Sequence, residues 1–169
     1  MSDTRISQTL TAEMLDTFEI FRGLTRAQLA AVAGIGTTRE VAAGQDIIAE
    51  REPAEALFVI RSGLVQICLE AGLDSTVAVS TLGSGKALGW SAVLGRQAYS
   101  GTARTVEPSS LIAIPAAPLR RMMLEDKDLA VALLTAIGRM TAARLDDTRY
   151  QLVGVMGHPG EPGDAAPAG

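Results

Sequence analysis

The feature that most constrains this fold is a run of short segments with a period of two, over residues 37–114. Glycine turns such as Ala42-Ala43-Gly44 and Ser62-Gly63 separate the segments. Strands that recur every eight to twelve residues or so are typical of an all-β sandwich or barrel. The sequence therefore predicts a mainly β fold. The expected strands are residues 37–41, 47–48, 57–60, 64–69, 76–82, 98–106 and 110–114.

Helical patterns flank this region. Thr11 and Thr25 are placed to cap two short helices, and Asp126 precedes a long one. The expected helices are residues 11–18, 26–33, 119–124 and 127–156. We expect one domain over residues 11–156, a flexible N-terminus at 1–10, and a disordered Pro-, Gly- and Ala-rich tail at 157–169.

Composition excludes several classes of protein. The 47% apolar content suffices for a core, and a net charge of −4 without a basic patch argues against a nucleic-acid surface. The single cysteine, Cys68, allows no disulfide within the chain and favours the cytoplasm. No apolar run approaches the ~20 residues of a membrane helix. We therefore expect a cytoplasmic protein that binds neither DNA nor a membrane.

The sequence also lacks the residues of an enzyme. Its one histidine, His158, lies in the tail, so the folded part offers no Ser–His or Cys–His pair and no histidine cluster for a metal. No phosphate-binding loop with its lysine is present. We expect no catalytic residue and no metal.

Residues 83–105 contain a glycine-rich stretch before a short apolar turn. Glycines free the backbone to bring several N–H groups to one point, and a helix N-terminus favours an anion. Two interpretations stand: a cradle for an anion, or a turn between strands that binds nothing.

The long helix carries a stripe whose spacing alternates between four and three residues, which is typical of a coiled-coil seam. A helix of ~30 residues is ~45 Å long, too long for one small barrel to cover. We expect a parallel homodimer through this helix, the alternative being that the stripe packs on its own domain. The stripe consists of Leu134, Gly138, Thr141, Leu145, Thr148, Leu152 and Val155.

Several motifs together resemble the cyclic nucleotide-binding domain, the sensor module of the catabolite activator protein family. Residues 57–65 (LFVIRSGLV) resemble its strand–turn–strand, and residues 85–94 align with its phosphate-binding cassette. Residues 99–103 lie where the cassette's return strand begins, and Arg144-Leu145 with Thr148 match the helix that closes over the base. The resemblance spans about residues 18–152. It implies a jelly-roll β-roll with short N-terminal helices and a long C-terminal helix.

Two departures from the family pattern affect the implied site. Trp90 stands where the family has a glutamate for the ribose hydroxyl, and Tyr99 where it has an arginine for the cyclic phosphate. The lost charge-assisted contact is worth about 1.5–3 kcal/mol. Trp90 either stacks on a planar ligand or fills the pocket. Arg104 has the wrong strand parity to replace the arginine, whereas Arg96 lies in the adjacent loop.

The resemblance therefore implies a degenerate site that relies on the main chain. The amides of residues 90–93 form the cradle, Ser91 and Ser100 donate hydroxyls, Trp90 and Tyr99 set selectivity, and Thr148 contacts the far end of the ligand. The expected ligand-binding residues are Gly89, Trp90, Ser91, Ala92, Val93, Tyr99, Ser100, Gly101 and Thr148. The implied ligand is a cyclic nucleotide, cAMP or cGMP.

The leading hypothesis is a stand-alone sensor that binds a small anionic ligand and signals through the long helix to an unknown protein partner. The alternative is a ligand-free dimeric scaffold. A third idea is a regulator that acts through a separate DNA-binding partner, because this chain shows no helix-turn-helix after the long helix.

Overall fold

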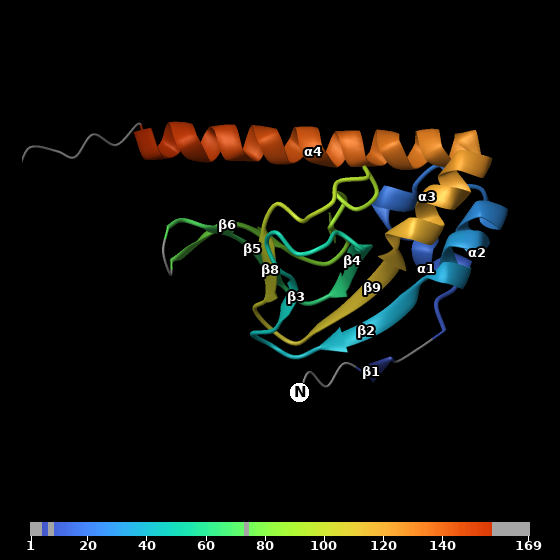
Figure 1. Cartoon of the computed structure of the whole chain (residues 1–169), viewed down its shortest axis with the longest axis horizontal. Helices are drawn as coiled ribbons and strands as arrows, with labels where there is room; N and C mark the ends of the chain where they lie inside the picture. Colours follow the sequence, from blue (N-terminus) through green and yellow to red (C-terminus); the bar gives the residue numbers. More distant parts are fainter. Residues whose placement is uncertain (1–4, 7–8, 73–74, 157–169) are drawn as a thin grey trace, which may run out of the picture. The chain divides into compact units, whose positions relative to one another are not determined.

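Two antiparallel sheets form a roll, with helices before and after it, in a computed structural model that describes residues 5–6, 9–72 and 75–156 (Figure 1). One sheet has the strand order β1-β2-β9-β4-β7 and the other β3-β8-β5-β6. This confirms the predicted mainly β roll. The strands are β1 Arg5–Ile6, β2 Thr37–Val41, β3 Asp46–Ile48, β4 Ala56–Ser62, β5 Val65–Glu70, β6 Thr76–Leu82, β7 Ala87–Leu88, β8 Thr102–Thr105 and β9 Ser109–Pro115. The helices are α1 Ala12–Asp16, η1 Glu19–Phe21, α2 Arg26–Ile35, α3 Ala116–Glu125 and α4 Lys127–Met156.

Strands β4 and β9 form the centre of the first sheet, where Leu57 pairs with Ile114 and Ile60 with Leu111. Their apolar runs are continuous rather than alternating, and the residues of both runs are buried. Both faces of these strands are covered, because α2 and α3 contact them and side chains from the second sheet join their core. Burial on both faces is the usual reason for such runs.

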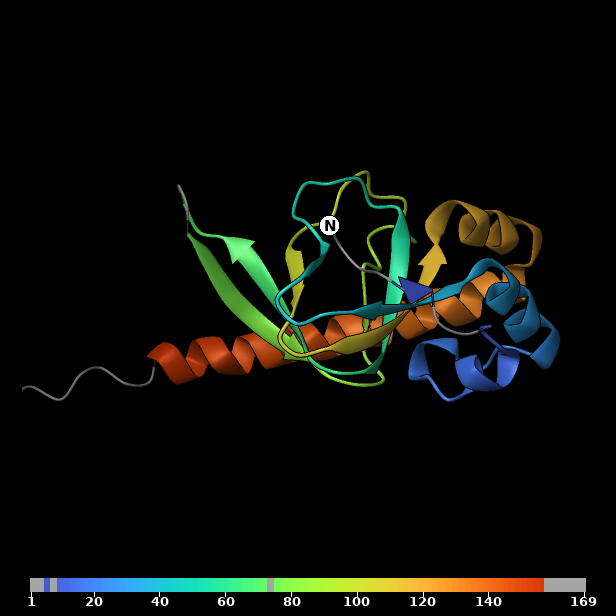
Figure 2. The same cartoon turned by 90° about the horizontal axis from the view of Figure 1, so that it is seen from below.

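The expected helix caps are present. The Thr11 hydroxyl accepts from the amide of Met14 at 3.3 Å, and Thr25 forms a capping box with Gln28. The Gln28 amide nitrogen also donates to Asp126 at 2.7 Å, and the other oxygen of Asp126 accepts from the amide of Leu129 at 3.0 Å. One hydrogen-bonded chain thus joins the start of α2 to the start of α4. Figure 2 shows α1 and α2 grouped at the same end of the roll as α3.

The structure corrects the predicted strand over residues 98–106. Strand β8 begins only at Thr102, because the main chain of Tyr99 bonds to Arg51 and Glu52 instead of β5. The apolar residues after Gly89 form successive turns and no α-helix. Sequence patterns did not indicate β1, η1 or β7, each of which has only two or three residues.

Helix α4 has its predicted bounds, and the chain divides within it into two compact units, residues 1–136 and 137–169. The predicted tail, 157–169, lies outside the described residues. Within the predicted flexible N-terminus, residues 5–6 pair with β2 and Leu10 is buried, while residues 1–4 and 7–8 are not described. Among the described helices, none combines the length and apolar character needed to cross a membrane.

Candidate functional site

The cassette, residues 85–94, is held against strand β4. Phe58 pairs with Leu88 and Val59 with Ala87, and the chain then turns at Gly89 with φ +75°. A Cβ at Gly89 would lie 2.7 Å from the carbonyl oxygen of Ala56. Only glycine therefore fits this position, both for its backbone conformation and for the close approach to β4.

The turn after Gly89 uses some of the amides that were expected to face a ligand. The amide of Ala92 donates to the carbonyl of Gly89 at 3.0 Å, and that of Val93 to the carbonyl of Trp90 at 3.0 Å. Within the described part of the chain, the amides of Trp90 and Ser91 donate to no backbone carbonyl. The predicted cradle over residues 90–93 is thus reduced to its first two amides.

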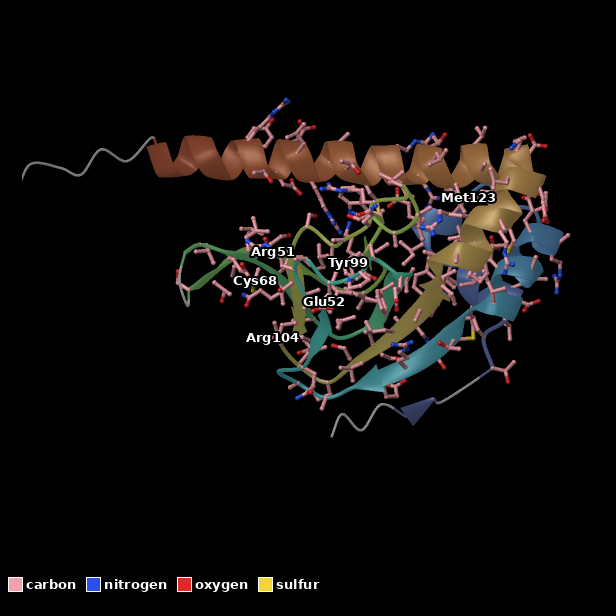
Figure 3. All side chains as sticks on the ribbon, in the orientation of Figure 1. Arg51, Glu52, Cys68, Tyr99, Arg104 and Met123 are labelled. Carbon is pink, nitrogen blue, oxygen red and sulfur yellow. The ribbon has the colours of Figure 1, made fainter. Side chains whose placement is uncertain are left out.

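Tyr99, which the resemblance predicts at the position of the family's arginine, is only 7% exposed. Its hydroxyl donates to the carbonyl of Ala56 at 2.9 Å and accepts from the amides of Glu55 at 3.2 Å and Ala56 at 3.0 Å. The ring packs with Ala92 and Ala116. Figure 3 shows Tyr99 among the side chains between the strands of the roll. A phenol has one donor and two acceptor lone pairs, so its hydrogen-bonding capacity is used.

The main chain of Tyr99 is also held. Its amide donates to the carbonyl of Glu52 at 3.0 Å, and its carbonyl accepts from the amide of Arg51 at 3.1 Å. The loop between β3 and β4 therefore binds both the backbone and the side-chain end of this residue. This loop is the part of the site that sequence reasoning missed, since its partners lie more than 40 residues away along the chain and share no local pattern.

Three of the neighbouring arginines have partners within the protein. Arg104 donates to both carboxylate oxygens of Asp46, at 2.7 and 3.0 Å, and this pair raises the pKa of the guanidinium above its ordinary value. Arg51 pairs with Glu70 at 3.1 Å, and Arg120 of α3 donates to the carbonyl of Ala92. Arg96 is exposed in the loop. None of the paired cations stands in for the missing arginine.

The other predicted residues have different surroundings. Ser91 is buried, Trp90 is half-buried and Ser100 is exposed. A Cβ at Gly101 would lie 3.0 Å from the side chain of Leu69, so β5 packs tightly here. The roll thus brings Gly89, Ala92 and Tyr99 together. Thr148, in the second unit, donates its hydroxyl to the carbonyl of Arg144 at 2.8 Å, and its contact with a ligand stays a prediction.

Comparison with known proteins agrees with this architecture. A putative cyclic nucleotide-binding protein from Geobacter metallireducens superimposes with a TM-score of 0.73 at 25% identity, over 80% of this chain and 98% of that one. The catabolite activator protein of Thermus thermophilus superimposes with a TM-score of 0.65 at 20% identity, over 80% and 63% of the two chains.

Sequence relatives are larger proteins. Glutaminase 2 of Bradyrhizobium diazoefficiens is 40% identical over 69 residues, which are 41% of this chain and 10% of that protein. The chain spans between 10% and 26% of the length of the curated relatives it matches. The profile of the cyclic nucleotide-binding domain matches residues 38–126, more than half of the sequence. The chain therefore belongs to the cyclic nucleotide-binding domain family.

Proposed function

We propose that this chain is a cytoplasmic regulatory module of its family that assembles with partners without a bound nucleotide. The observation that carries the proposal is that the Tyr99 hydroxyl makes three hydrogen bonds to Glu55 and Ala56. The resemblance predicts Tyr99 at the position of the phosphate-binding arginine. A neutral phenol with no free donor cannot give a phosphate the charge-assisted contact, worth about 1.5–3 kcal/mol, of a guanidinium.

The exposed residues of helix α4 favour a second copy of this chain as the partner. Val131, Leu134 and Leu145 are 63%, 44% and 50% exposed, and all three lie on one stripe with heptad spacing. The hydroxyls of Thr141 and Thr148 on the same stripe donate to carbonyls four residues earlier, both at 2.8 Å. Their polar groups are thus satisfied within the helix, so a facing helix can pack on the stripe without stranding a hydroxyl.

The second candidate is a sensor of a small anionic, nucleotide-type ligand such as cAMP or cGMP, which signals through α4. It is favoured by the amides of Trp90 and Ser91, which donate to no backbone carbonyl of the described chain, and by the exposed hydroxyl-bearing Ser100. Amides alone can hold an anion, but with fewer contacts than the family pattern implies. In this case the module transmits ligand binding to a protein partner not yet identified.

Calorimetric titration and thermal melting with cAMP, cGMP and a cyclic dinucleotide at millimolar concentration separate the two candidates. The first predicts neither heat nor a melting shift. The second predicts stabilisation that grows with ligand, by about 2.7 kcal/mol at one hundred times the dissociation constant. Ser100→Glu is the matched variant, because its charge repels an anion in the cassette. A shift in the wild type that this variant loses would establish the sensor.

A further inference from the structure

The segment that binds Tyr99, residues 49–56, consists of the loop after β3 and the first residue of β4, and most of it pairs with residues 97–102, which lead into β8. The amide of Ala54 donates to the carbonyl of Gln97 at 3.0 Å, and Pro53 forms a bridge with Ala98. At the other end, the amide of Glu50 donates to the hydroxyl of Thr102 at 3.0 Å. With the two main-chain bonds to Tyr99, these contacts join the loop to residues 97–102.

The loop has an unusual backbone at Arg51, whose φ is +68°. Among the described residues it is the one non-glycine residue with a positive φ. This conformation is unfavourable for an arginine and persists only where surrounding contacts enforce it. Here it accompanies a reversal of the chain in which the amide of Arg51 and the carbonyl of Glu52 both bond to Tyr99.

The same loop is tied to strand β5 through Glu70. The guanidinium of Arg51 lies 3.1 Å from the Glu70 carboxylate, and the Glu50 carboxylate accepts from the amide of Glu70 at 2.9 Å. Because Cys68 pairs with Thr102 in the β5·β8 ladder, Glu70 lies beside the start of the return strand. Both side chains of the ion pair are exposed, at 76% and 46%, so salt weakens it.

We propose that residues 49–56 are an autoinhibitory strap that keeps the cassette closed on Tyr99, with the Arg51–Glu70 ion pair as its latch. This rests on the proposed function, in which Tyr99 takes the place of a ligand's anchor. Opening the strap frees the Tyr99 hydroxyl from Ala56, so the closed strap keeps ligands out of the cassette. The latch sets how often the strap opens.

Hydrogen exchange of the full chain without nucleotide, followed by NMR, tests the latch. Glu70→Gln keeps the shape of the side chain and removes its charge. We expect exchange at the amides of Arg51, Ala54 and Tyr99 to rise two- to fivefold, about what the loss of an exposed ion pair allows. In the wild type, 1 M NaCl should raise the exchange rates by the same factor. In the variant, salt should not raise them further.

Asp46→Asn is the control, because it removes a second exposed ion pair, Asp46–Arg104, from the same sheet. It should leave the three strap amides unchanged. The strap proposal is overturned if hydrogen exchange at these amides is unaltered in Glu70→Gln, or if it rises equally in Asp46→Asn. Nucleotide binding by the wild type together with faster exchange in Glu70→Gln would instead overturn ligand-independent function and retain the strap.

Discussion

The cassette and helix α4 differ in how far their own chain covers them. Around the cassette, Tyr99 bonds to the strap and Arg120 donates to the carbonyl of Ala92, so these polar groups meet partners in the same chain. Along α4, Val131, Leu134 and Leu145 remain exposed. A surface that its own chain satisfies has little left for a ligand, whereas an uncovered apolar stripe gains from a partner. The difference favours assembly over ligand binding.

The largest expected effect on stability comes from a substitution at Gly89, where the cassette lies closest to strand β4. Gly89→Ala should lower the free energy of unfolding by about 3 kcal/mol or more, since it combines an unfavourable φ with a Cβ 2.7 Å from the Ala56 carbonyl. Gly95→Ala is the control, with φ +76° and no atom within 4 Å of its Cβ; it should lose about 1 kcal/mol. If urea unfolding gives the same loss of free energy for both variants, the close contact between Gly89 and β4 does not contribute to stability.

The stripe on α4 is tested by charging it. Leu145→Asp should weaken the dimer about a hundredfold, because each assembly loses two apolar contacts and brings two like charges together, about 3 kcal/mol in all. Sedimentation equilibrium measures this. Ala143→Asp, an exposed position off the stripe, should leave the dimer intact. If both variants dissociate to the same extent, or if the wild type is already monomeric, the stripe on α4 is not a dimer interface.

Removing the Tyr99 hydroxyl tests how much its hydrogen bonds contribute to the stability of the cassette. Tyr99→Phe leaves the amides of Glu55 and Ala56 without their acceptor, so unfolding should become easier by about 1–3 kcal/mol. The matched control is Tyr150→Phe on α4, where the ring is 79% exposed and the change should stay within about 0.5 kcal/mol. A Tyr99→Phe variant as stable as the wild type would remove the basis for a closed cassette.

The smallest effect concerns the start of α4. The hydrogen bond from Gln28, followed by that from the amide of Leu129, lowers the pKa of Asp126 below its ordinary value. A lowered folded-state pKa gives stability that is present above the unfolded pKa, near 4, and is lost as pH falls through the folded value. The melting temperature of the wild type should exceed that of Asp126→Asn at pH 7, and the gap should narrow as the pH falls below about 4. A gap as large at pH 2.5 as at pH 7 would contradict this role.

Much of the fold was predictable because local chemistry encodes it. Thr11, Thr25 and Asp126 cap helices as expected, and the bounds of β6 and α4 match the predicted segments. The return strand was predicted too long, because alternation at residues 98–101 did not reveal that the strap takes the hydrogen bonds of Tyr99. The domain limits at residues 11 and 156 stay predictions.

The candidate site was only partly predictable. Gly89 and Tyr99 lie close together, and Trp90, which follows Gly89, is half-buried. Contacts of these residues with a ligand stay predictions. The roles of Arg51, Glu55 and Arg120 could not be foreseen, since hydrogen bonds between residues so far apart in the chain leave no periodic signal.

The amino-acid order by itself determined the β-roll and its helices, because periodicity, caps and glycine turns act between near neighbours. The resemblance also predicts Tyr99 at the position of the family's arginine. Only the tertiary structure decided what that tyrosine does. A hydroxyl's partners depend on which backbone groups the folded chain brings within about 3 Å of it, and here they belong to a loop more than 40 residues away.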